Sequence, residues 1–90
     1  MAIYQHLRKE VKKNMTRFEF IRDFAFNLKI LMNERCMSQA DLSYASKIDK
    51  GTISRYVQGD IMPTLKNVIN IAVALRCDIN DLINTDERLE

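Results

Sequence analysis

The apolar residues of the chain recur at helical spacing along most of its length. Over about residues 17–35 an apolar side chain returns every three or four positions, which is typical of one long amphipathic helix. The same spacing predicts shorter helices at 39–46, 50–58 and 65–76, with a last turn at 79–83. Two Gly and one Pro leave little material for hairpin turns, so the sequence predicts an all-α fold.

Residues that favour helix ends stand at the borders of these patterns. Thr16, with Glu19 three residues later, has the sequence of a capping box, and Ser38 is a suitable N-cap for the helix at 39–46. The other predicted borders are Asp49 and Asp78 as N-caps, Gly59 as a left-handed helix end, and Pro63 with Thr64 as the opening of the fourth helix.

The apolar faces of the longer helices predict the core. Each of these helices is expected to bury one stripe of side chains, and Phe24 and Met32 flank the stripe of the long helix. The expected stripes are Phe18, Ile21, Ala25, Leu28 and Leu31 in the long helix and Leu65, Val68, Ile69, Ala72 and Leu75 in the fourth.

Residues 1–16 are predicted to form a separate amphipathic element. Ile3, Leu7 and Val11 lie four positions apart, and basic residues occupy the other side of this predicted helix. The expected organisation is therefore an N-terminal helix or arm at 1–16, one compact domain at 17–83 and a polar tail at 84–90.

Composition excludes several classes of protein. Cys36 and Cys77, 41 positions apart, and a single His are too few for a disulfide-rich scaffold or a structural zinc site, and they favour a reducing, cytoplasmic environment. No apolar run approaches the ~20 residues of a membrane span. The sequence carries no recognisable carboxylate pair, nucleophile–base pair, Gly-rich phosphate loop or metal cluster, so neither an enzyme nor a cofactor is predicted.

The charge of the chain is unevenly distributed. The net charge of +2 is small, but residues 1–37 carry eight Lys or Arg against four Asp or Glu, and residues 63–90 carry three against five. A basic N-terminal part and an acidic C-terminal part are consistent with one face turned towards an anion, and equally with an ordinary mixed surface.

The segment from Ser38 to Gly59 is the most informative part of the chain. Its two short helices are joined by about three residues, 47–49, a connection too short to fold them back antiparallel, so they are expected to cross steeply. The expected contacts between them join Leu42, Ala45 and Ile48 of the first to Ile53 and Val57 of the second.

The outer face of the second short helix is expected to protrude without any large apolar side chain. A helix of this size fits the major groove of DNA, where Arg and Lys can donate to the acceptor atoms of guanine. The residues on this face are Lys50, Gly51, Ser54 and Arg55.

Several short motifs together resemble the lambda-repressor-like helix-turn-helix family, also called Cro/CI or XRE. The resemblance covers residues from about 21 to 83 and depends on the combined spacing rather than on any one motif. The matching residues are Ser38-Gln-Ala-Asp-Leu, Thr52-Ile-Ser-Arg, Gly59, Pro63, Leu65 and Ile71-Ala-Val-Ala-Leu.

The resemblance implies a compact five-helix domain, here with an additional N-terminal helix, that binds double-stranded DNA in a sequence-specific way. It implies a transcriptional regulator, expected to be a repressor, in which the helix at 39–46 braces against the DNA backbone and the helix at 50–58 reads bases. The implied base-reading residues are Lys50, Gly51, Ser54 and Arg55, and the implied backbone contacts are Ser38, Gln39, Lys47, Thr52, Tyr56 and Asn67.

A homodimer on an inverted repeat is also expected. The family generally binds palindromic sites as two-fold dimers, and one module contacts too few base pairs to select a site in a genome. Two surfaces are candidates for the dimer contact: the N-terminal helix with Phe20 or Phe26, and the helix at 79–83.

The chain departs from the family pattern at several positions. Cys36 and Lys47 stand where the family usually has Gly, so a positive φ at either residue would cost about 1 kcal/mol. Met32 and Val57 replace an Arg and a Glu that usually form a buried ion pair, so we expect these two side chains to touch in the core. The loop that is often basic in the family reads Asp60-Ile61-Met62 here.

Two other functions are compatible with parts of the sequence. An antitoxin or anti-repressor of the same fold would bind a protein partner, and Ile61, Met62 and the Phe residues favour it. An enzyme is disfavoured, because Cys36, Cys77 and the lone His6 have no catalytic partners in the sequence and are interpreted as structural or surface residues.

Overall fold

The computed structural model describes residues 16–84, which form five α-helices and no strand. They are α2 (Arg17–Glu34), α3 (Gln39–Ser46), α4 (Lys50–Gln58), α5 (Leu65–Leu75) and α6 (Ile79–Ile83). The all-α prediction is confirmed, and each helix begins at its predicted residue. The long helix and the fourth helix each end one residue earlier than expected. The helix or arm predicted at 1–16 lies almost wholly outside the described residues, as does most of the predicted tail.

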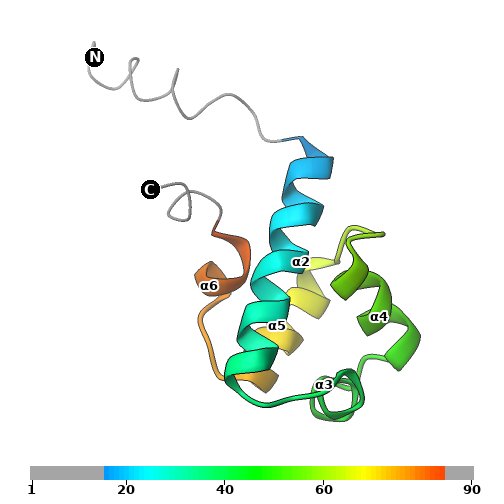
Figure 1. Ribbon diagram of the computed structural model, residues 1–90, viewed down its shortest axis with the longest axis vertical. Helices are drawn as coiled ribbons and strands as arrows, with labels where there is room; N and C mark the ends of the chain where they lie inside the picture. The colour runs from blue at the N-terminus through cyan, green and yellow to red at the C-terminus, as the bar shows by residue number, and fades with distance from the viewer. Residues whose placement is uncertain (1–15, 85–90) are drawn as a thin grey trace.

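The long helix α2 is the centre of the arrangement. It packs against α4 on one side and α6 on the other, and Figure 1 shows these two helices on opposite sides of it. Helix α3 packs against α4 and α5, and α5 also packs against α6. Within residues 16–84 no helix is both long enough and apolar enough to cross a membrane.

The helix starts are fixed by local side-chain caps. Thr16 Oγ1 accepts the Glu19 N–H (3.1 Å), and Glu19 Oε1 accepts the Thr16 N–H (3.0 Å), so the predicted capping box is confirmed. Thr64 caps α5 by accepting the Asn67 N–H at 3.1 Å. At α6 the Asp81 carboxylate accepts the Asp78 N–H at 3.2 Å.

Four helix ends use a left-handed residue. The two departures from Gly noted in the sequence adopt this conformation, with φ of 55° at Cys36 and 66° at Lys47, and Arg76 does so with φ of 58°. Gly59 has φ of 76°, as predicted. Only Gly adopts such angles without steric cost, so the three non-Gly residues each carry about 1–2 kcal/mol of backbone strain.

The core is a single cluster between the helices. Phe24, which was expected only to flank the stripe of α2, lies at the centre, and Met32 belongs to the same cluster. Val57 packs against that cluster from α4, so both members of the predicted Met32–Val57 contact lie on the expected side of their helices. The buried members are Phe24, Leu28, Leu31, Met32, Leu42, Ile48, Ile53, Tyr56, Val68, Ile71, Ala72, Leu75 and Leu82.

Four residues predicted to be buried are exposed. Phe18 lies in the first turn of α2, which projects beyond the neighbouring helices in Figure 1. On α5 the core receives Val68, Ala72 and Leu75 as predicted, together with Ile71, whereas Leu65 and Ile69 lie on a second, exposed face. Ala45 is also exposed, because α3 turns Leu42 and Ser46 inward instead.

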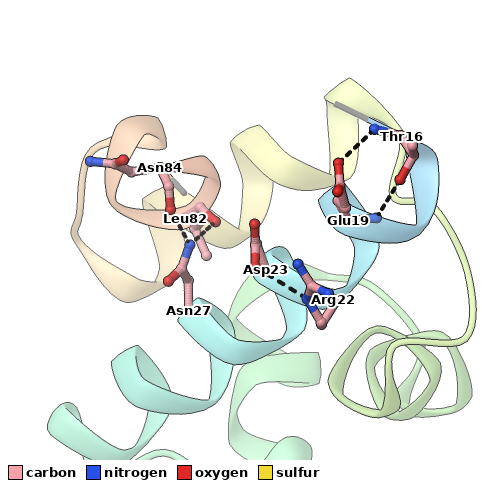
Figure 2. A network of polar contacts seen from close by, with 7 residues as sticks. All are labelled: Thr16, Glu19, Arg22, Asp23, Asn27, Leu82 and Asn84. Carbon is pink, nitrogen blue, oxygen red and sulfur yellow. Dashed lines mark hydrogen bonds and ion pairs between the residues drawn. The ribbon is translucent and has the colours of Figure 1, made fainter. Parts of the chain in front are cut away.

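Asn27 of α2 and Arg35, the residue that follows α2, hold the ends of α6 and α5. Asn27 Nδ2 donates to the carbonyl oxygens of Leu82 (2.7 Å) and Asn84 (2.9 Å), as Figure 2 shows. Arg35 Nε donates to the Leu75 carbonyl at 2.7 Å, and its guanidinium also reaches the Arg76 carbonyl at 3.3 Å. The last carbonyls of a helix have no intrahelical donor, so these contacts satisfy groups that the helices themselves leave open.

Candidate nucleic-acid interface

The turn between α3 and α4 is held by two serines of α3. The Ser46 hydroxyl accepts the Ile48 N–H at 3.3 Å, and the Ser43 hydroxyl donates to the Ile48 carbonyl. Both backbone polar groups of Ile48 are therefore satisfied while its side chain is buried in the core. With Lys47 in the left-handed conformation, this turn fixes the angle between the two short helices.

Helix α4 is anchored by its inner face. Ile53 and Tyr56 are buried, and the Tyr56 ring packs edge-on against Phe24 with centroids 5.7 Å apart. The Tyr56 hydroxyl accepts a hydrogen bond from Asn67 Nδ2 at 2.8 Å, which links α4 to the start of α5. These contacts hold α4 so that its opposite face is left to solvent.

The outer face of α4 is formed by Lys50, Gly51, Ser54, Arg55 and Gln58. At 100° per residue these five positions fall within an arc of about 140°. All are exposed except Ser54, which is half-buried. Gln58 was not among the predicted site residues, although it lies four residues after Ser54 and therefore on the same face of the helix. Its Nε2 donates to Ser54 Oγ at 2.9 Å.

The N-terminus of α4 is shaped by Asp49. Its carboxylate accepts the Thr52 hydroxyl (2.8 Å) and the Thr52 N–H (3.0 Å), and these two bonds hold the pKa of Asp49 below its usual value. A Cβ atom on Gly51 would lie 3.2 Å from the same carboxylate. The glycine therefore leaves room for the cap at the exposed tip of the helix.

The N-terminus of α3 carries a second capping box. Ser38 Oγ accepts the Asp41 N–H and Asp41 accepts the Ser38 N–H, both at 3.0 Å. The pKa of Asp41 is lowered first by the backbone N–H of Ser38 and then by the Ser38 hydroxyl. Gln39, the first residue of α3, is half-buried beside this cap.

The remaining predicted site residues differ in accessibility. Lys47 is exposed, and its Nζ lies 6.0 Å from the centre of the ring of Tyr44, an exposed aromatic residue that was not among the predicted site residues. Thr52 and Asn67 are half-buried. Tyr56 is only 2% exposed, so the structure places it in the core, where its hydroxyl orients Asn67.

Charges in this region are balanced. Residues 38–60 contain three basic side chains, Lys47, Lys50 and Arg55, and three acidic ones, Asp41, Asp49 and Asp60. All six are exposed. The long-range attraction of this surface for a polyanion is therefore weak, and any strong selectivity must come from close contacts.

Metal-binding and thiol chemistry find little support in residues 16–84. This part of the chain contains no group of three or more His, Cys, Asp or Glu residues close enough to hold a metal ion. Both cysteines are free thiols, with Cys36 exposed and Cys77 half-buried. Burial, followed by the nearby Asp81 carboxylate, raises the pKa of the Cys77 thiol, which makes it a poor nucleophile.

Comparisons with known proteins agree with this arrangement. The protein-family model of the Cro/C1-type helix-turn-helix DNA-binding domain matches residues 27–87 of the sequence. The fold is similar to the crystal structure of the restriction-modification controller protein C.AhdI from Aeromonas hydrophila, with a TM-score of 0.67 and 24% identity. That match covers 69% of this chain and 94% of the other, and it confirms the predicted five-helix fold. No curated protein matches the chain.

Proposed function

The chain belongs to the family of Cro/C1-type helix-turn-helix DNA-binding domains, and we propose that it is a sequence-specific transcriptional regulator that reads the major groove with α4. The observation that carries this proposal is the outer face of α4. It presents donors and small residues over one continuous arc, while Ile53 and Tyr56 on the inner face anchor the helix. The major groove, about 12 Å wide, admits a helix presented in this way.

Each residue of the outer face has a proposed role that follows from its chemistry. Lys50 and Arg55 donate to the O6 and N7 acceptors of guanine, for which Arg can use two donors at once. Gly51 lets the tip of α4 approach the bases closely, because it has no side chain to intervene. Ser54 and Gln58 form a hydrogen-bonded pair whose remaining polar atoms face outward to a base edge or a phosphate.

The residues around α4 are proposed to grip the DNA backbone. Gln39 and the N–H groups of the first turn of α3 face a phosphate, where the helix dipole also favours an anion. Ser38, Lys47, Thr52 and Asn67 supply further backbone contacts. Tyr56 takes part indirectly, by holding the Asn67 amide in place.

Two copies are proposed to bind an inverted repeat. One copy offers few base contacts and a charge-balanced surface, so on its own it would neither discriminate sites well nor bind tightly. Two copies with half-sites about 34 Å apart would double the contacted sequence. We further propose repression as the outcome, because occupying a promoter excludes polymerase without requiring another partner.

Selection of bound sequences from a random duplex pool tests this function. Arg55→Ala and Lys50→Ala should each weaken binding to the selected site by about 1–3 kcal/mol and relax the preference at one base position. Gln39→Ala should weaken binding to all sequences nearly alike, because phosphate contacts carry no base information. Lys29→Ala, which removes an exposed cation from α2, is the matched control and should change little.

Two results would contradict the proposal. If Arg55→Ala left both the affinity and the selected motif unchanged, α4 would not be the reading helix. If no motif were enriched at either of two salt concentrations, the alternative of a protein-interaction module, such as an antitoxin or anti-repressor, would be favoured instead.

A further inference from the structure

An acidic side chain, Asp49, stands at the tip of the helix that is proposed to read DNA. It is exposed, and it lies directly before Lys50, the first residue of α4. A helix cap by itself does not require a charge, since hydroxyl groups of Ser38 and Thr64 cap α3 and α5. A negative charge at the point where a polyanion approaches is unfavourable unless a hydrogen-bond donor faces it. The carboxylate therefore needs a specific donor on the bound DNA.

Both oxygens of this carboxylate are held in place. Oδ1 accepts the Thr52 hydroxyl at 2.8 Å and Oδ2 accepts the Thr52 N–H at 3.0 Å, so the orientation of the group is set before DNA binds. These two bonds also lower the pKa of Asp49, which is therefore ionised at neutral pH. An ionised carboxylate has about four acceptor sites, so it can still accept a hydrogen bond from a ligand.

Gly51 shows which side of the helix tip the carboxylate reaches. This glycine belongs to the outer face of α4, and a Cβ atom built on it would lie 3.2 Å from Asp49 Oδ2. The carboxylate therefore lies beside the outer face and away from the inner face that Ile53 and Tyr56 form in the core. Because residue 51 has no side chain, it does not separate the carboxylate from a base edge.

We propose that Asp49 is a further specificity-determining residue, which accepts a hydrogen bond from the N4 amino group of a cytosine in the bound site. This inference rests on the proposed function and adds an acceptor to its reading residues. Guanine and thymine present acceptors in the major groove, which a carboxylate repels. Adenine presents its N6 donor beside the N7 acceptor, whereas cytosine presents its N4 donor without such a neighbour. Cytosine is therefore the base that an ionised carboxylate favours most.

Asp49 and Lys50 together match the two bases of a C·G pair. The guanine presents its O6 and N7 acceptors to a donor such as Lys50, and the cytosine presents its N4 donor to an acceptor such as Asp49. Reversing the pair would bring acceptors towards the carboxylate and a donor towards the ammonium group. Two adjacent residues of opposite charge can thus distinguish C·G from G·C as well as from both A·T orientations.

Selection of bound duplexes by the full chain tests the proposal with variants that keep the cap. Ser and Asn cap helices about as well as Asp, so Asp49→Ser and Asp49→Asn should leave urea unfolding nearly unchanged. Neither variant should select the cytosine that the wild type selects. In gel-shift titrations, replacing that cytosine by thymine should weaken wild-type binding about tenfold, and this ratio should fall to about one in Asp49→Ser. Asp41→Asn is the matched control, because it removes the same charge from the cap of α3 and should leave the ratio unchanged.

The space beside Gly51 provides a second test. Gly51→Ala would place its Cβ atom 3.2 Å from Asp49 Oδ2, so the carboxylate must shift, and the cytosine preference of the wild type should decrease. In the Asp49→Ser background the same change should not lower that preference further. If Asp49→Ser keeps the wild-type ratio while Arg55→Ala still relaxes its own position, the proposal is overturned and the proposed function stands. A wild type that selects no motif would contradict both.

Discussion

Replacing Asn27 with leucine should detach α6 from the fold at a measurable cost in stability. The Asn27 side chain is only 7% exposed, and its Nδ2 donates to the carbonyl oxygens of Leu82 (2.7 Å) and Asn84 (2.9 Å) at the end of α6 (Figure 2). Helix α6 has five residues, far fewer than the 12–15 or so below which isolated helices are marginal in water. Its position therefore depends on such tertiary contacts and on the burial of Leu82.

The magnitude follows from the two hydrogen bonds that Asn27→Leu removes. A buried carbonyl that loses its hydrogen bond costs about 1–3 kcal/mol. The Leu82 carbonyl bond is buried and should lose this full amount, whereas the Asn84 carbonyl is partly accessible and can bind water instead. We therefore expect a total loss of about 2–4 kcal/mol. Leucine has a similar volume, so the loss does not include a large cavity term.

Urea unfolding followed by circular dichroism measures this loss. Asn33→Leu is the matched control, because Asn33 is exposed on the same helix, and its free energy of unfolding should change by no more than about 0.5 kcal/mol. Hydrogen exchange should also become faster in α6 than in α4 for Asn27→Leu. A loss below about 0.5 kcal/mol, with exchange in α6 unchanged, would show that these two bonds do not hold the helix.

The other predictions concern backbone strain and the α2–α4 contact. Lys47→Gly and Arg76→Gly should each raise the free energy of unfolding by about 0.5–1 kcal/mol, because relief of a left-handed side chain exceeds the added entropy of the unfolded chain; only Lys47→Gly should weaken DNA binding in a gel-shift titration. Val57→Glu should lower the free energy of unfolding by about 1–3 kcal/mol, because Val57 is half-buried against the cluster that contains Met32, and Met32→Arg added to it should recover part of that loss in urea unfolding. A loss in the double variant equal to the sum of the losses in Val57→Glu and Met32→Arg alone would show that the two side chains do not interact.

The helix boundaries could be predicted because they depend on neighbouring residues. A cap such as Ser38 or Asp49 bonds to an N–H three residues away, so its signal is complete within one turn of sequence. The left-handed end at Gly59 is equally local, whereas a left-handed Lys47 was raised only by comparison with the family pattern. The left-handed conformation of Arg76 was not predicted, because the apolar pattern was expected to continue the fourth helix through this residue and no Gly marks its end.

The exposed face of α5 could not be predicted from the apolar pattern. Leu65 and Ile69 fit the helical spacing as well as Val68 and Leu75 do, and the pattern alone does not say which face meets the core. That choice is made by where α3 and α6 lie, which depends on contacts far apart in the sequence. The bond from Arg35 to the end of α5 likewise joins residues 40 apart in the sequence, so the local pattern does not predict it either.

The exposure of the candidate site residues could be predicted where it depends on helical phase and not where it depends on packing. Lys50 and Arg55 share an exposed face because they are five residues apart on one helix, which spacing alone establishes. Tyr56 was expected at the backbone contact, but its ring is held in the core by Phe24, a residue of another helix. Gln58 could have been found by extending the same phase by one turn.

Helix α2 and its C-terminal cap connect α4 to the last two helices of the fold. Phe24 holds α4 through the Tyr56 ring, and three residues later Asn27 holds the end of α6. Arg35, directly after α2, holds the end of α5 by a hydrogen bond to its last carbonyl. The orientation of α4 relative to α5 and α6 is thus fixed through α2. If two copies bind an inverted repeat as proposed, this would favour a single separation between the two copies of α4, and the spacer between half-sites should accordingly tolerate little variation in length.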